Sequence, residues 1–105
     1  MSEQTYEVGD VITAVGKFKR IVTSSLVNDE PTYEYADPDT VVLTITSPSG
    51  VESTKSLAGG TVVKVTLGIF YAKVSTTEPG TWVLEWSTTG DPTVYEKRLV
   101  PVGAQ

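Results

Sequence analysis

The stretch GIFYAKVSTTEPGTWVLEW, residues 68–86, contains both tryptophans of the chain and decides its fold class. Residues 70–75 and 82–87 each alternate between apolar and more polar side chains, and a short Pro-Gly turn separates the two runs. A period of two predicts β-strands with one buried face, so we expect an antiparallel hairpin here. Aromatic side chains bury about 150–250 Å² each, which makes this hairpin the largest expected block of the core. The core face is expected to carry Phe70, Trp82, Leu84 and Trp86.

The first long strand is expected at residues 11–19, where Ile12 and Phe18 lie on the same face as Ala14 and Gly16. This face contains the aromatic Phe18 and is therefore the better core face. A glycine within a strand weakens it and is typical of close packing. We expect the small residues Ala14 and Gly16 to leave room for the two tryptophans.

The remaining chain shows short alternating runs separated by Gly/Pro turns, and no segment has a helical period of 3.6. Seven to eight such strands predict an all-β fold, an immunoglobulin-like antiparallel β-sandwich. In the last strand, 94–102, two apolar sets lie on opposite faces, and a bulge near Lys97-Arg98 would reconcile them. We expect one domain over residues 1–105, with flexible ends at 1–5 and 103–105.

Residues 22–36 are predicted to form either a hairpin arm or a long loop, because Asn28-Asp29-Glu30-Pro31 has turn chemistry. An ordinary surface loop is one interpretation and a contact arm is the other. Tyrosine suits contact surfaces, since it has a large apolar body and a polar tip. Tyr71 is expected to point outward if Phe70 points inward. The candidate partner-binding residues are Leu26, Val27, Tyr33, Tyr35 and Tyr71.

The composition of 105 residues contains no cysteine and no histidine. Disulfides, the usual zinc sites and serine–histidine triads therefore lack their parts. With a net charge of −5, the chain repels nucleic acid on average, unless Lys17, Lys19 and Arg20 form a local patch. No signal peptide and no membrane-length apolar run is visible, so we expect a soluble protein that contacts no membrane.

Two acidic residues, Asp37 and Asp39, flank Pro38 and could supply oxygen ligands to calcium. A regular calcium loop is missing, so a simple turn with solvated carboxylates is the favoured interpretation. The sequence contains no catalytic constellation, and we expect no cofactor, no metal and no enzyme activity.

Four phrases occur in a fixed order and together cover nearly the whole chain, residues 6–102. They resemble a group of small Ig-like proteins encoded among the virion structural genes of tailed bacteriophages. The phrases are YEVGDVITAVGKFK at 6–19, DPDTVVLTITSPSG at 37–50, GIFYAKV at 68–74 and EPGTWVLEWSTTG at 78–90. The resemblance implies a capsid-accessory, head–tail or tail protein without enzyme activity or cofactor. Residues 22–35 depart from the pattern, since such proteins commonly have a shorter turn there.

The first hypothesis is therefore a virion protein, assembled in the host cytoplasm, that binds other capsid, connector or tail proteins. It would use strand edges and the 22–35 segment, in many copies or as a homo-oligomer, and would not bind nucleic acid sequence-specifically. The alternative hypothesis is an adhesion module that binds carbohydrate through Tyr33, Tyr35 and Tyr71.

Overall fold

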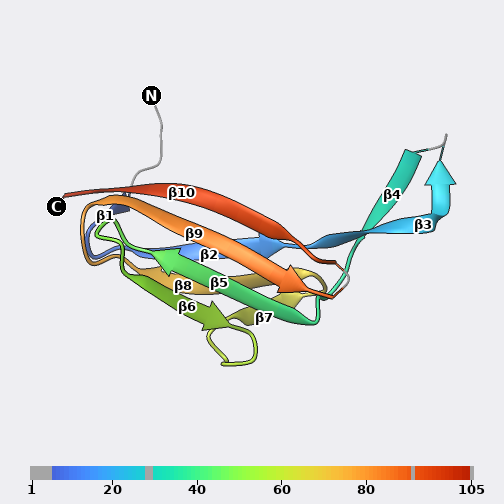
Figure 1. The fold of residues 1–105 in the computed structure, drawn as a ribbon, viewed down its shortest axis with the longest axis horizontal. Helices are drawn as coiled ribbons and strands as arrows, with labels where there is room; N and C mark the ends of the chain where they lie inside the picture. The colour runs from blue at the N-terminus through green and yellow to red at the C-terminus, as the bar shows by residue number, and fades with distance from the viewer. Residues whose placement is uncertain (1–5, 28–29, 91, 105) are drawn as a thin grey trace.

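The computed structural model of the chain is all-β, with 66% of residues in strands and no helix among the described residues. It describes residues 6–27, 30–90 and 92–104, and gives the backbone alone for residues 22–27, 30 and 31. No described segment is a helix of the length and apolar character needed to cross a membrane. Figure 1 shows long strands side by side in a body, and a separate two-stranded projection at one end.

The described residues form ten strands. Their bounds are β1 Tyr6–Glu7, β2 Val11–Lys17, β3 Lys19–Val27, β4 Glu30–Tyr35, β5 Thr40–Thr46, β6 Glu52–Ser56, β7 Val63–Thr66, β8 Ile69–Ser75, β9 Gly80–Thr89 and β10 Tyr95–Gly103. Eight of them belong to two sheets of the body, which we call sheet A, in the order β1-β10-β9-β5-β6, and sheet B, in the order β2-β8-β7. Within the described part of the chain, strands β3 and β4 pair only with each other, and we call this hairpin the arm.

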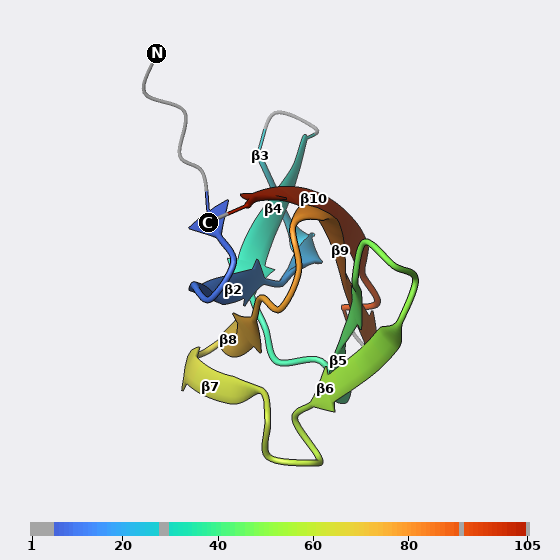
Figure 2. The ribbon, with the colours of Figure 1, turned by 90° about the vertical axis from the view of Figure 1, so that its left-hand side faces the viewer.

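Sheet A curls strongly around one side of the core, as a half-barrel, and sheet B closes part of the opposite side (Figure 2). The strands of sheet A pair antiparallel, except that β1 runs parallel to β10 with Tyr6 opposite Val102. Gly103, expected in a flexible end, belongs to β10 and lies opposite Glu7. Residues 1–5 lie outside the described residues.

The expected hairpin of residues 68–86 is wrong, although both of its strands exist. Strand β8 pairs with β2 and β7 in sheet B, whereas β9 pairs with β10 and β5 in sheet A. An alternating pattern tells which face of a strand is buried but not which strand lies beside it. Two strands with strongly apolar faces can pair side by side, or can face each other across the core as these two do.

The crossing from β8 to β9 is fixed by Thr76, whose side chain is buried. Its hydroxyl donates to the carbonyl of Asp10 at 2.7 Å and lies 3.2 Å from the carbonyl of Glu7. The backbone N–H of Gly9 also donates to the Thr76 carbonyl at 3.1 Å. These bonds hold the end of β8 against the β1–β2 turn, so the chain leaves sheet B there and enters sheet A at Gly80.

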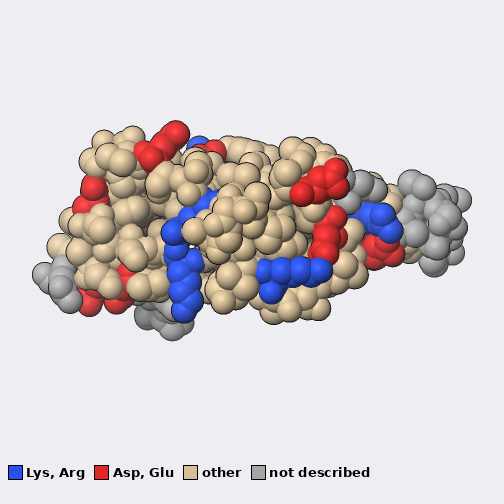
Figure 3. Space-filling model, turned by 90° about the horizontal axis from the view of Figure 1, so that it is seen from below, with Lys and Arg blue, Asp and Glu red and all other residues tan. Residues whose placement is uncertain are grey.

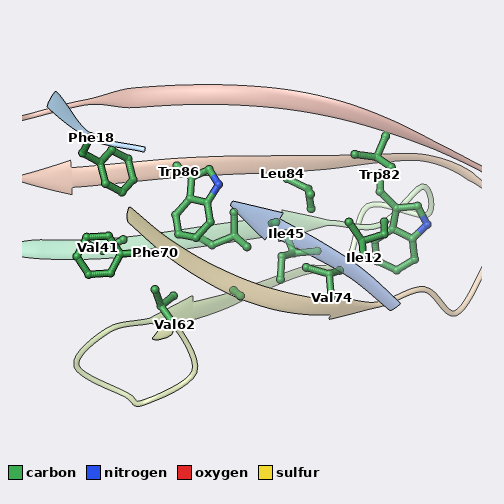
Figure 4. Close-up of a cluster of buried hydrophobic side chains, with 14 of the residues drawn as sticks. Ile12, Phe18, Val41, Ile45, Val62, Phe70, Val74, Trp82, Leu84 and Trp86 are labelled. Atoms are coloured by element: carbon green, nitrogen blue, oxygen red, sulfur yellow. The ribbon is translucent and has the colours of Figure 1, made fainter. Parts of the chain in front are cut away.

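The core lies between the two sheets and contains the aromatic residues expected on the hydrophobic faces of residues 11–19 and 68–86. Phe18 and Phe70 are buried, with ring centroids 5.9 Å apart, and Trp86 meets Phe18 edge-on at 6.0 Å. Figure 4 shows these rings together at one end of the core and Trp82 at the other. The structure buries all five expected core residues, Phe18, Phe70, Trp82, Leu84 and Trp86.

Gly16 makes the close aromatic packing possible. A Cβ atom placed on it would lie 2.7 Å from Phe18 Cζ and 3.1 Å from Trp86 Cδ2. Both separations are shorter than a van der Waals contact of about 3.5 Å between carbon atoms. Room for a tryptophan over Gly16, expected from the sequence, is therefore confirmed.

The expected bulge in the last strand is wrong. β10 pairs with β9 in an unbroken register from Tyr95 opposite Ser87 to Val102 opposite Gly80. Val100 and Val102 are buried, while Tyr95 and Leu99 stand on the outer face at 66% and 60% exposure. The two apolar sets need no reconciliation, because one of them is left in solvent.

Candidate interaction surface

The arm is an antiparallel hairpin that projects from the body at the end opposite β1 (Figure 1). It begins at Lys19, directly after β2, and returns to the body at Tyr35. Its register runs from Lys19 opposite Tyr35 to Val22 opposite Thr32, and shifts before Val27 and Glu30. Of the hairpin and the long loop expected for residues 22–36, the described strands show the hairpin, and its role as a contact arm stays a prediction.

One face of the arm is apolar and exposed. Ile21 lies directly opposite Tyr33, and the next pair along this face is Lys19 with Tyr35. Ile21 is 52% exposed, Tyr33 60% and Tyr35 36%. The Lys19 ammonium stands 4.9 Å from the centroid of the Tyr35 ring, which is cation–π geometry. We call Ile21, Tyr33 and Tyr35 the arm face.

The other face of the arm is polar. Arg20 and Glu34 lie opposite each other, and the Arg20 Nε donates to a Glu34 carboxylate oxygen at 2.6 Å. Both side chains are 45% exposed, so the pair contributes little to stability, on the order of 0–1 kcal/mol. Its effect is to make the two faces of the hairpin chemically different.

The root of the arm is tied to the turn between β7 and β8. Phe18 N–H donates to the Gly68 carbonyl at 2.8 Å, and Ala36 N–H donates to the Phe18 carbonyl at 3.1 Å. Gly68 has a φ of +74°, and a Cβ atom there would lie 2.7 Å from the Phe18 carbonyl oxygen. Only glycine fits both the left-handed backbone and this close approach. The arm is therefore fixed at its base by backbone hydrogen bonds.

Asp37 continues this attachment just beyond the arm. One carboxylate oxygen accepts the Gly68 N–H at 2.8 Å, and the other forms an ion pair with Lys64. The hydrogen bond from Lys64 and then that from Gly68 lower the pKa of Asp37 below its ordinary value. Among the described residues no group of three or more acidic side chains is placed to hold a metal. Asp37 is thus a structural carboxylate bonded to Gly68 and Lys64, and not the solvated turn carboxylate that the sequence favoured.

The five candidate partner-binding residues do not gather in one place. Tyr33 and Tyr35 share the arm face, but Tyr71 lies in sheet B between Val15 and Val63 and is half-buried. Leu26 and Val27 belong to β3, and their side chains lie outside the described part of the chain. Sequence reasoning missed Ile21, although its position opposite a tyrosine follows from the alternation of a hairpin.

The free strand edges of the body carry charged residues on their inner faces. Directly opposite residues share a face, so Lys55, opposite Leu43, and Lys64, opposite Phe70, point to the core side of edge strands β6 and β7. On β10, Arg98 opposite Leu84 does the same. Inward charges on edge strands oppose unwanted strand pairing. Binding of a partner through the strand edges stays a prediction.

The basic patch expected from Lys17, Lys19 and Arg20 is broken up by contacts of two of its members. Lys19 covers Tyr35, and Arg20 is paired with Glu34. Figure 3 shows cationic and anionic side chains interspersed over the underside of the molecule.

Comparisons of the chain with models of protein families, with curated proteins and with solved structures gave no match.

Proposed function

We propose that this chain is a non-enzymatic structural protein of a tailed-bacteriophage particle. It docks on an oligomeric capsid or head–tail surface through the arm, and it is located in the virion. The observation that carries the proposal is the exposed arm face of Ile21, Tyr33 and Tyr35, held out from the body on a hydrogen-bonded root. The absence of histidine and cysteine supports a role without catalysis.

The finer fold proposal is an immunoglobulin-like sandwich. Variable-type domains of that fold add strands to a sheet in which the last, the second-last and a middle strand are neighbours. In sheet A the order β10-β9-β5-β6 matches this arrangement, and the β2-β8-β7 order of sheet B matches the opposing sheet. The arm then occupies the connection between the two sheets that loops from β2 to β5.

The physical case for the arm as a binding element is its lack of cover. A single two-stranded hairpin is marginally stable in water and needs a third strand or a packed layer. Tyrosines on such a ribbon are typical of interface centres, where aromatic residues are enriched. An assembled particle supplies the missing layer, because it presents the same surface in many copies.

Quantitative mass spectrometry of purified particles tests the location. We expect the chain at a fixed copy number, about six or twelve for a ring at the neck or tail and roughly hundreds for capsid decoration. Absence of the chain from particles that retain their other structural proteins would refute the proposal.

Binding of purified protein to particles that lack the chain tests the arm. The double variant Tyr33→Ala with Tyr35→Ala is expected to lose association by about tenfold or more, as for residues at the centre of an interface. The matched control is Tyr95→Ala, since Tyr95 is 66% exposed on the outer face of β10 and outside the arm. Equal binding by the double variant and the control would remove the arm from the proposal.

A further inference from the structure

The outer side of sheet B, turned away from the core, has an apolar centre. Directly opposite residues share a face, so Val15 of β2, Tyr71 of β8 and Val63 of β7 form one row across the sheet. Val63 is 42% exposed, while Val15, Tyr71 and the neighbouring Ile69 of β8 are half-buried. Figure 2 shows sheet A on the opposite, inner side of sheet B. We call Val15, Val63, Ile69 and Tyr71 the sheet B face.

The strands of sheet B carry only positive charge. β2, β7 and β8 contain Lys17, Lys64 and Lys73 but no aspartate or glutamate, although the whole chain has a net charge of −5. Lys64 forms an ion pair with Asp37. Lys17 and Lys73 are exposed, and neither has an ion-pair partner among the described residues. Sheet B therefore presents two uncompensated cations in an otherwise acidic chain.

These two lysines lie at opposite ends of the sheet B face. Lys17 is opposite Ile69 and Lys73 is opposite Thr13, so the Val15–Tyr71 pair lies between them. An apolar and aromatic centre with charged residues around it is the usual anatomy of a protein–protein interface.

Glu96 of β10 borders the sheet B face on the side of β2. It lines a hollow of about 390 Å³ with Val15 and Lys17. Its carboxylate lies 3.8 Å from the guanidinium group of Arg98, which offsets its negative charge. The sheet B face and its border therefore keep an excess of positive charge.

The sheet B face adjoins the arm face. Lys17 and Lys19 flank the buried Phe18 and are both exposed, so the outer side of β2 leads into the arm face. After β7, the exposed Leu67 lines a hollow of about 510 Å³ together with Tyr35. The two apolar surfaces therefore meet at the root of the arm.

We propose that the sheet B face and the arm face dock together on one protein surface, which presents an apolar centre flanked by carboxylates. The arm face supplies the apolar contact that holds the complex. Lys17 and Lys73 steer the acidic partner, because complementary charges at the rim of an interface raise the association rate. This inference rests on the proposed function, since it states the chemistry of the surface that the arm binds.

A nucleic acid is a poorer match to the sheet B face than an acidic protein surface. Two lysines neutralise few phosphates, and affinity for a nucleic acid grows with the number of phosphates contacted. Single-strand binding also requires exposed rings on which bases stack, whereas Tyr71 is half-buried between Val15 and Val63.

Association and dissociation rates on particles that lack the chain test the inference. The variant Lys17→Glu with Lys73→Glu is expected to associate about tenfold or more slowly than wild type, with a similar dissociation rate. Its association should also depend less on salt between about 50 and about 500 mM, where charge interactions become screened. The single variant Lys73→Glu, expected to associate about threefold more slowly, has a matched control in Lys97→Glu. Lys97 is exposed on the outer side of sheet A, opposite Glu85.

The apolar contacts should act on the other rate. Tyr33→Ala with Tyr35→Ala is expected to raise the dissociation rate, and Val63→Ser should raise it by about threefold. The control for Val63→Ser is Val51→Ser, since Val51 is 67% exposed and lies between β5 and β6, outside the sheet B face. Thermal unfolding of the lysine variants should match wild type, because both positions are exposed.

The outcomes separate this inference from the proposed function. If the double lysine variant associates like wild type while the arm variant dissociates faster, the inference is overturned and the proposed function stands. If wild type does not bind the particles, both are overturned. Binding of wild type to a double-stranded DNA fragment, lost in the lysine variant, would overturn the inference in favour of a nucleic acid. Oligomers of purified wild type that the lysine variant does not form would overturn it in favour of a second copy.

Discussion

The arm and the body are built from strands of the same kind but differ in what covers them. In β9, Trp82, Leu84 and Trp86 point to one face, which is buried against sheet B. In the arm, Tyr33 and Tyr35 lie on one face and Glu34 between them on the other, yet the tyrosine face remains in solvent. Folding free energy comes mainly from buried apolar area, so the body carries the stability and the arm leaves apolar surface for a partner.

The largest expected difference between the two regions is the loss of unfolding free energy when an aromatic side chain is replaced by alanine. Trp86→Ala leaves a cavity in the core and is expected to lower the free energy of unfolding by about 3–5 kcal/mol. Tyr33→Ala, at an exposed position, is expected to change it by less than about 0.5 kcal/mol. Urea denaturation of both variants measures this contrast, and similar losses would mean that the arm is part of the folding core.

The joint between arm and body is expected to be the next most sensitive position. Gly68→Ala forces an alanine into a left-handed backbone and against the carbonyl of Phe18, at a cost of about 3 kcal/mol. Gly60→Ala is the matched control, since Gly60 also has a positive φ of +80° but has no atom within 4 Å of the added Cβ. Backbone strain alone costs Gly60→Ala about 1–2 kcal/mol. Equal destabilisation of the two variants would contradict the close contact at the joint.

The crossing between the sheets depends on a buried hydroxyl. Thr76→Val removes the donor to the Asp10 carbonyl while keeping the shape of the side chain, and is expected to cost about 1–2 kcal/mol. The neighbouring exposed Thr77→Val serves as the control and should be nearly neutral. Thermal unfolding compares them, and a neutral Thr76→Val would show that the crossing is fixed by other contacts.

The smallest expected effect is a pH dependence at Asp37. Because its pKa in the folded protein is lowered, its stabilising contribution is complete above the ordinary value of about 3.9 and is lost as the pH falls through the folded pKa. Wild type should therefore lose more stability than Asp37→Asn between neutral pH and pH values below about 4. Lys64→Met should weaken this dependence, since Lys64 is the largest cause of the shift. Identical pH profiles for wild type and Asp37→Asn would contradict the assignment.

The sequence predicted most of the strands and the buried faces, because alternation follows directly from the geometry of an extended chain. Phe18, Phe70 and the tryptophans are buried as expected. Which strands pair side by side was harder to predict. β8 and β9 follow one another with a Pro-Gly turn between them, yet they belong to different sheets, and the bonds of Thr76 to residues 7–10 hold the end of β8 in sheet B.

The candidate surface was predictable in part. Turn residues at 28–31 and the alternation of Tyr33 and Tyr35 indicated an arm. Its root could not be predicted, since it depends on Gly68, which is more than thirty residues away in the sequence and joins Phe18 through the backbone.

The central claim is that the arm serves association and the body serves folding. Arg20 and Glu34 lie directly opposite each other, so residues 21–33 can be replaced by a two-residue Asn-Gly turn without disturbing the root. The decisive measurement is the free energy of unfolding of this shortened chain, together with its binding to particles that lack the protein. We expect a change in unfolding free energy of less than about 1 kcal/mol and complete loss of binding. Unfolding of the shortened chain, or binding equal to wild type, would contradict the account.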